Sequence, residues 1–126
     1  MSKHETPLTR RYWKSVGGTL IEEFPAVKRS KTHGPRLIDG MIVLGEETKI
    51  AKAADVDVSV KDIIVIQTKA KRLGMYLMGQ AVFSMELMKK FNPRSIKSVA
   101  ICTKGDDVLE PLLQSYPNVE VVIYRT

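Results

Sequence analysis

Three residues of this chain could act together on a charged substrate: Asp39, Gln67 and Lys69. Asp39 interrupts an apolar run, and Gln67 and Lys69 follow the next long apolar run. A carboxylate and an amide oxygen are both ligands that a hard divalent cation accepts. A lysine beside such a cation can orient an attacking water, favour its deprotonated form and offset phosphate charge. These residue types therefore predict metal-assisted hydrolysis, provided that the fold brings them together.

The stretch 62–72 is expected to form the central strand. Its residues 63–66 are all β-branched, which is typical of a strand buried on both faces. Because side chains alternate along a strand, Gln67 and Lys69 project to one face and Thr68 to the other. Burying an amide without partners costs about 2–7 kcal/mol, so the fold must supply groups that meet these side chains.

Asp39 lies in the preceding expected strand, residues 36–44. Gly40 directly after it indicates a bulge or a close approach of another backbone. Neighbouring strands lie about 4.8 Å apart. If these two strands are neighbours, Asp39, Gln67 and Lys69 are expected to converge from one face of the sheet.

The other elements follow from periodicity and turn residues. Helices are expected at 6–16, 75–91 and 107–115, strands at 19–24, 96–103 and 119–124, a short edge strand within 49–61 and a loop at 28–36. Pro25 should end its strand, Gly79 should let the long helix pack closely on the sheet, and Asp107 with Glu110 can form a capping box. Three early strands can form an antiparallel meander, and strand–helix–strand connections predict parallel pairing. We expect an α/β fold with a mixed sheet covered on both faces.

Composition sets the class of protein. The 126 residues, 44% hydrophobic and 27% charged, suit one globular domain spanning 1–126. The single cysteine, Cys102, lies in an apolar strand and is expected in the core, so a reducing, cytoplasmic setting is the default. No hydrophobic signal region begins the sequence and no apolar run is long enough to span a bilayer, so no membrane partner is expected.

The net charge is +6, and the placement of the cations is more informative than their number. One group of cations flanks the approach to Asp39 and another follows the central strand: Lys28, Arg29, Lys31 and Arg36, then Lys71 and Arg72. A loop and a strand end that converge on one site would give it a positive field suited to a phosphate backbone. These six residues are the predicted nucleic-acid contacts.

This layout resembles the PD-(D/E)xK nuclease superfamily. Asp39 matches the motif's aspartate, Lys69 its lysine and Gln67 its second acid, while Gly79-Gln80 occupies the place of a helix glutamine found in several members. The resemblance implies a restriction-endonuclease-like, three-layer α/β/α fold. It also implies a nuclease that uses Mg²⁺ or Mn²⁺ to hydrolyse phosphodiester bonds in DNA. A homodimer would suit the cutting of two strands.

Two departures from the family pattern bear on catalysis. Gln67 replaces an acid, which removes one negative charge from the metal site. The family often has a glutamate on its first helix, and 6–15 contains none. Glu22 or Glu23 could replace it. Glu22 is favoured because strand alternation puts it on one face with Leu20 and Phe24.

The same residues also allow interpretations without catalysis. Asp39-Gly40 could form a hairpin turn, and Gln67 and Lys69 could be the solvated end of a strand. On the same fold, the chain could be a catalytically inactive domain that binds nucleic acid or another partner. Metal binding separates the enzyme from that alternative.

Overall fold

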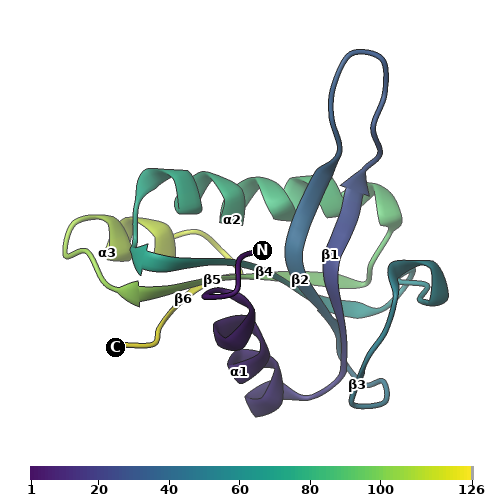
Figure 1. Ribbon diagram of the computed structural model, residues 1–126, viewed down its shortest axis with the longest axis horizontal. Coiled ribbons are helices and arrows are strands. Elements are labelled where there is room, and N and C mark those ends of the chain that lie inside the picture. The colour runs from purple at the N-terminus through teal and green to yellow at the C-terminus, as the bar shows by residue number, and fades with distance from the viewer. Residues whose placement is uncertain (126) are drawn as a thin grey trace.

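The computed structural model describes residues 1–125 and shows an α/β arrangement built on one six-stranded mixed sheet (Figure 1). The helices are α1 (Thr6–Val16), α2 (Met75–Met88) and α3 (Leu109–Gln114), with 3₁₀ turns at Ala53–Asp55 and Lys89–Phe91. The strands are β1 (Thr19–Val27), β2 (Arg36–Val43), β3 (Lys49–Ile50), β4 (Asp62–Arg72), β5 (Ser95–Lys104) and β6 (Val119–Ile123). Over these residues, every helix is too short or too polar to cross a membrane.

The strand order β3-β1-β2-β4-β5-β6 places the long strand β4 inside the sheet. β1, β2 and β4 pair antiparallel, which confirms the expected meander. β4, β5 and β6 pair parallel because each connection between them contains a helix. β3 is a two-residue edge strand beside β1.

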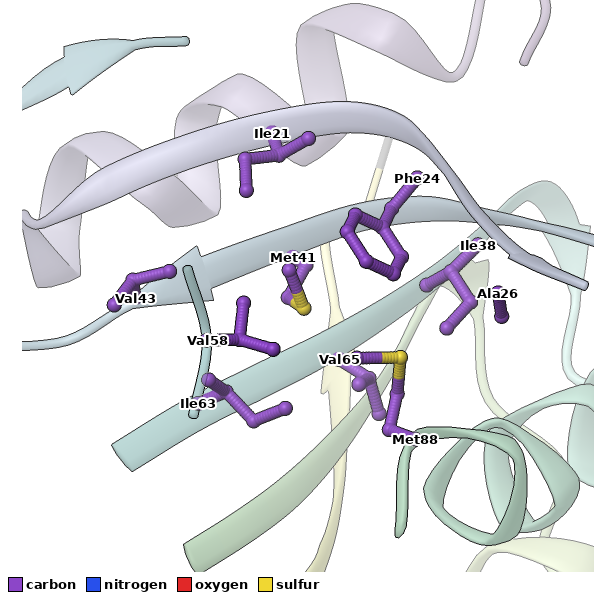
Figure 2. Packing of buried hydrophobic residues seen from close by; sticks show 10 residues of the cluster. All are labelled: Ile21, Phe24, Ala26, Ile38, Met41, Val43, Val58, Ile63, Val65 and Met88. Carbon is purple, nitrogen blue, oxygen red and sulfur yellow. The ribbon is translucent and has the colours of Figure 1, made fainter. Parts of the chain in front are cut away.

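Helices cover both faces of the sheet, with α1 on one side and α2 on the other (Figure 1). On the face that α1 covers, the α1 face, the buried apolar cluster is Tyr12, Leu20, Ile42, Ile64, Ile66, Val99 and Ile101. On the opposite α2 face, Met88 packs on the β1–β2–β4 part (Figure 2) and Leu77 and Ala81 pack on β5. Residues 63–66 are buried and divide between the two faces, as their sequence predicts.

Two boundary predictions are wrong. β1 continues through Pro25, which lies in register with Leu37. β3 pairs only with Thr19 and Leu20, so the outer side of β1 near Pro25 is an edge, where a proline is tolerated. The start of α3 bonds to Asp106 and not to the predicted Asp107. Oδ1 of Asp106 accepts hydrogen bonds from the backbone N–H groups of Val108 and Leu109.

The regular alternation of side chains between the two faces is interrupted in β1 and β2, between the paired residues Ile21–Met41 and Phe24–Ile38. Ile21 and Phe24 lie in one cluster on the α2 face, although two residues separate them. Ile38 and Met41 do the same in β2, and Figure 2 shows all four side chains in that cluster. Glu23, between the first pair, has a φ of 54°, a left-handed conformation that resets the alternation. This change decides which way Asp39 points.

Candidate active site

The candidate site lies where β2 and β4 separate. The two strands pair from Val43–Ile63 to Gly40–Ile66, and beyond that pair β2 remains bonded to β1 while β4 remains bonded to β5. We call this point the fork. Asp39 and Gln67 are the first residues beyond the last pair, so the structure brings the two halves of the motif to the same level of neighbouring strands.

Asp39 closes the fork through a side-chain contact with the β4 backbone. Its Oδ2 accepts a hydrogen bond of 2.9 Å from the backbone N–H of Thr68, the residue between Gln67 and Lys69. Burial raises the pKa of the Asp39 carboxyl, and the bond from Thr68 partly opposes that rise. The positive amino group of Met1 also lowers this pKa, whereas Glu23 and Glu5 raise it by charge repulsion. Asp39 is therefore a partly buried carboxylate with incomplete compensation of its charge.

The α1 helix packs closely against the strand beside Asp39. A Cβ placed on Gly40 would lie 2.9 Å from Cγ2 of Thr9 and 3.6 Å from Cβ of Ile66. Thr9 is fully buried, and its Oγ1 lies 2.7 Å from Oγ1 of Thr68. The approach at Gly40 is therefore close, but it comes from a side chain of α1 and not, as was expected, from a backbone.

Gln67 belongs to the opposite face. Its side chain is 3% exposed, and its Nε2 donates a 2.7 Å hydrogen bond to Oγ of Ser84 in α2. Ser84 in turn donates to the backbone oxygen of Gln80 at 2.6 Å. Oε1 of Gln67 is buried without any hydrogen-bond partner among the described residues. An acceptor left in this state costs about 1–3 kcal/mol.

The expectation that Asp39, Gln67 and Lys69 converge from one face is wrong. Gln67 donates its hydrogen bond to α2. The pKa of Asp39, in contrast, is raised by the charges of Glu23 and of Glu5, which directly precedes α1. Lys69 lies in register with Cys102, which packs with Leu77 and Ala81 of α2, so alternation places Lys69 on the face of Gln67. The interrupted alternation at Asp39 is the physical cause, because it moves one side chain to the α1 face.

The choice of Glu22 as the third metal ligand is also not supported. Glu22 receives two hydrogen bonds from the guanidinium of Arg10, at 2.8 and 3.1 Å. Its presumed face-sharing with both Leu20 and Phe24 fails, because those two residues lie in different clusters. Glu23 is the glutamate that influences Asp39, and it forms an ion pair with the amino group of Met1.

Sequence reasoning missed the groups around Asp39 on the α1 face. Glu5, Thr9 and Thr68 carry no motif; the docking of α1 brings the first two toward Asp39, and the pairing of β2 with β4 brings Thr68. Among residues 1–125, no three Asp, Glu, His or Cys side chains form a group suited to a metal ion.

The predicted nucleic-acid contacts lie in three places. Lys28, Arg29 and Lys31 are exposed on the long β1–β2 arm that extends away from the sheet (Figure 1). Arg36 lines a groove together with Gln67. Lys71 and Arg72 line a separate depression of about 560 Å³ with Lys104 and Arg125. The last two residues were not predicted, because only strand pairing brings them beside the end of β4.

Other predictions concern the core. Cys102 is buried and unpaired, as its apolar strand indicated. Gly79 does not serve close packing on the sheet, because a Cβ placed there meets no atom within 4 Å. It faces the groove that Arg36 and Gln67 line.

None of the protein-family models, curated proteins and solved structures compared with this chain matches it. The geometry of the fork therefore carries the functional argument.

Proposed function

We propose that this protein is a metal-dependent nuclease of the PD-(D/E)xK type, with a restriction-endonuclease-like core and its centre at the fork. The succession α1, β1, β2, β4, α2, β5 supports this, since it reproduces the helix, three strands, helix and strand of that core. The short β3 is an addition at the sheet edge. Asp39 on β2 and Gln67-Thr68-Lys69 on β4 resemble the motif in sequence and lie where the two strands separate, which also supports the proposal.

One observation carries the proposal: two oxygen groups at the fork, one half-buried and one buried, are not fully compensated. The Asp39 carboxyl has a raised pKa, and Oε1 of Gln67 lacks a partner. Both flank Thr68, whose N–H binds Asp39. A hard cation at the fork would compensate Asp39 directly, and it would compensate Gln67 once that amide turns from α2 toward Asp39, since carboxylate and amide oxygens suit Mg²⁺ and Mn²⁺.

In this proposal the residues have separate roles in binding the metal, orienting the water and contacting the DNA. Asp39 and Gln67 would hold the cation, which supplies Lewis-acid activation of a water or phosphate oxygen. Gln67 must first release Ser84, because its amide points to α2. Lys69, half-buried at the end of β4, would orient the attacking water. The cations at positions 28, 29, 31, 36, 71 and 72 would contact the DNA backbone.

The test is cleavage of supercoiled and linear DNA with Mn²⁺ or Mg²⁺. Wild-type protein should nick DNA, and Asp39→Asn and Lys69→Ala should each reduce the rate at least about 100-fold. Lys52→Ala, an exposed lysine without an ion pair in the described chain, is the matched control and should keep full activity. Activity that survives Lys69→Ala would reject this assignment.

A second candidate is a domain that binds nucleic acid on the same fold without hydrolysis. The Gln67–Ser84 and Glu22–Arg10 hydrogen bonds favour it, because both side chains are already engaged as structural groups. Calorimetry with Mn²⁺ separates the two candidates. No heat of Mn²⁺ binding, together with DNA binding that weakens steeply with salt, would select the binding domain.

A further inference from the structure

We infer that the groove between α2 and the start of β2 holds unpaired bases, so that this protein prefers single-stranded nucleic acid to duplex. We call it the aromatic groove. Its volume is about 490 Å³, and its lining includes Tyr76, Gly79, Gln80, Phe83, Arg36 and Gln67. This inference rests on the proposed action on nucleic acid, but not on hydrolysis.

Two aromatic side chains stand on the outer side of α2. Tyr76 is 74% exposed and Phe83 is 66% exposed, whereas Leu77, Ala81 and Met88 face the sheet. Packing on the sheet explains the apolar residues on the inner side of α2, but it does not explain the apolar residues on its outer side. Stacking on exposed aromatic rings contributes about 1–3 kcal/mol per base and tolerates any sequence.

The space between the two rings suits a row of bases. Tyr76 and Phe83 are seven residues apart, which is about 10 Å along a helix. Gly79 lies between them, and a Cβ placed on it meets nothing within 4 Å, so the surface there is open. A larger side chain at position 79 would fill the space that a stacked base needs.

Polar groups in the groove match the edges of bases. Gln80 and Gln67 both line it; because Oε1 of Gln67 is buried, the half-exposed amide of Gln80 is the one that reaches a base edge. Base edges offer donors only when they are unpaired or in a groove of the duplex, and single strands expose their Watson–Crick edges. An amide-lined groove with two stacking rings therefore fits unpaired bases better than a phosphate backbone alone.

Charge complementarity selects a polyanion rather than a second copy of this chain. Arg36 lines the groove, the first turn of α2 contains no acidic residue, and the neighbouring arm carries Lys28, Arg29 and Lys31. Two copies that met through this groove would bring these cations together. A nucleic acid would bring phosphates to them.

The experiment measures fluorescence anisotropy of a labelled oligonucleotide of about 20 nucleotides, either single-stranded or annealed to its complement. EDTA is present, so hydrolysis cannot contribute. Wild-type protein should bind the single strand at least about tenfold more tightly than the duplex. Tyr76→Ala and Phe83→Ala should each weaken single-strand binding about tenfold and leave duplex binding unchanged.

Matched variants distinguish stacking from general apolar contact. Phe83→Trp should preserve binding, whereas Phe83→Leu should weaken it as much as Phe83→Ala. Tyr116→Ala is the control, since Tyr116 is 51% exposed and lies outside the groove. Circular dichroism verifies that every variant is folded.

Three results would overturn the inference. These are equal affinity for both forms of DNA, full binding by Phe83→Leu, or a wild-type dimer in sedimentation that Phe83→Ala dissociates. The last result would assign the groove to a second copy. Failure of Mn²⁺-dependent cleavage alone would reject the nuclease and leave this inference standing, because binding is measured without metal.

Discussion

Gln67 and Thr68 are neighbours in β4, both almost completely buried, and their side chains enter different environments on the two faces of the sheet. Thr68 meets the hydroxyl of Thr9 in α1 at 2.7 Å, on a face closed by close helix packing. Gln67 meets Ser84 in α2 and retains an oxygen without a partner beside an open groove. At this level of the sheet the polar side chain on the α1 face is satisfied by its partner, whereas the one on the α2 face keeps an acceptor without a partner.

The largest contrast between the faces is expected from adding one methyl group to each. Gly40→Ala places a Cβ 2.9 Å from Thr9, so it should lower the free energy of unfolding by about 1–3 kcal/mol. Gly79→Ala meets nothing within 4 Å and should raise it by up to about 1 kcal/mol. Urea denaturation measures both. Equal, small effects would mean that α1 does not close its face.

Removing the hydroxyl of Thr68 tests the closed face directly. Thr68→Val keeps the shape of the side chain but leaves the buried Oγ1 of Thr9 without this partner, so a loss of about 1–2 kcal/mol is expected. Thr68→Ser keeps the hydroxyl and is the matched control. Should the valine variant be as stable as wild type, the threonine pair would have no role in stability.

Gln67→Met makes the corresponding change on the open face. It removes the unpartnered oxygen at nearly constant volume, and Ser84 still donates to Gln80. We expect stability within about 1 kcal/mol of wild type or above it, with loss of Mn²⁺-dependent cleavage. A destabilisation as large as that of Thr68→Val would show that Oε1 has a partner in solution.

The smallest effect concerns pH. Because the pKa of Asp39 is raised in the folded protein, the native state binds a proton more readily than the unfolded chain, and wild-type stability falls as pH rises through that pKa. Asp39→Asn keeps an acceptor for Thr68 without the charge. Its melting temperature should exceed that of wild type at pH 7, and this gain should shrink as pH falls toward about 4. A gain independent of pH would exclude the charge as its cause.

The sequence predicted the fold better than the site. The β-branched run 63–66 indicated a strand buried on both faces, and the helices between the later strands indicated parallel pairing; both are confirmed. Gly40 indicated a crowded position, although a side chain approaches it and not the expected backbone. The face of Asp39 was wrong, because counting side chains assumes regular alternation, and the positive φ of Glu23 on the neighbouring strand has no sequence signal.

Predictions from neighbouring residues were also wrong or incomplete where the partners of a side chain come from distant segments. Glu22 was favoured for the site, yet α1 brings Arg10 to it, and Lys104 joins Lys71 and Arg72 only through the pairing of β4 with β5. Gly79 suggested tight packing because glycine is unfavourable inside a helix. The rotation of α2 on the sheet decides which of its residues face outward, and that rotation is set by all of its contacts together.

By itself the sequence determined which segments form strands and helices, and that a carboxylate lies on one long strand and an amide and a lysine on the next. Those properties depend on periodicity and residue type over short distances. Only the tertiary structure decided that Asp39 turns toward α1 and Gln67 toward α2, and that one amide oxygen stays without a partner. The reason is physical: the direction of a buried side chain depends on backbone irregularities and helix docking, which arise from contacts between residues far apart in the chain.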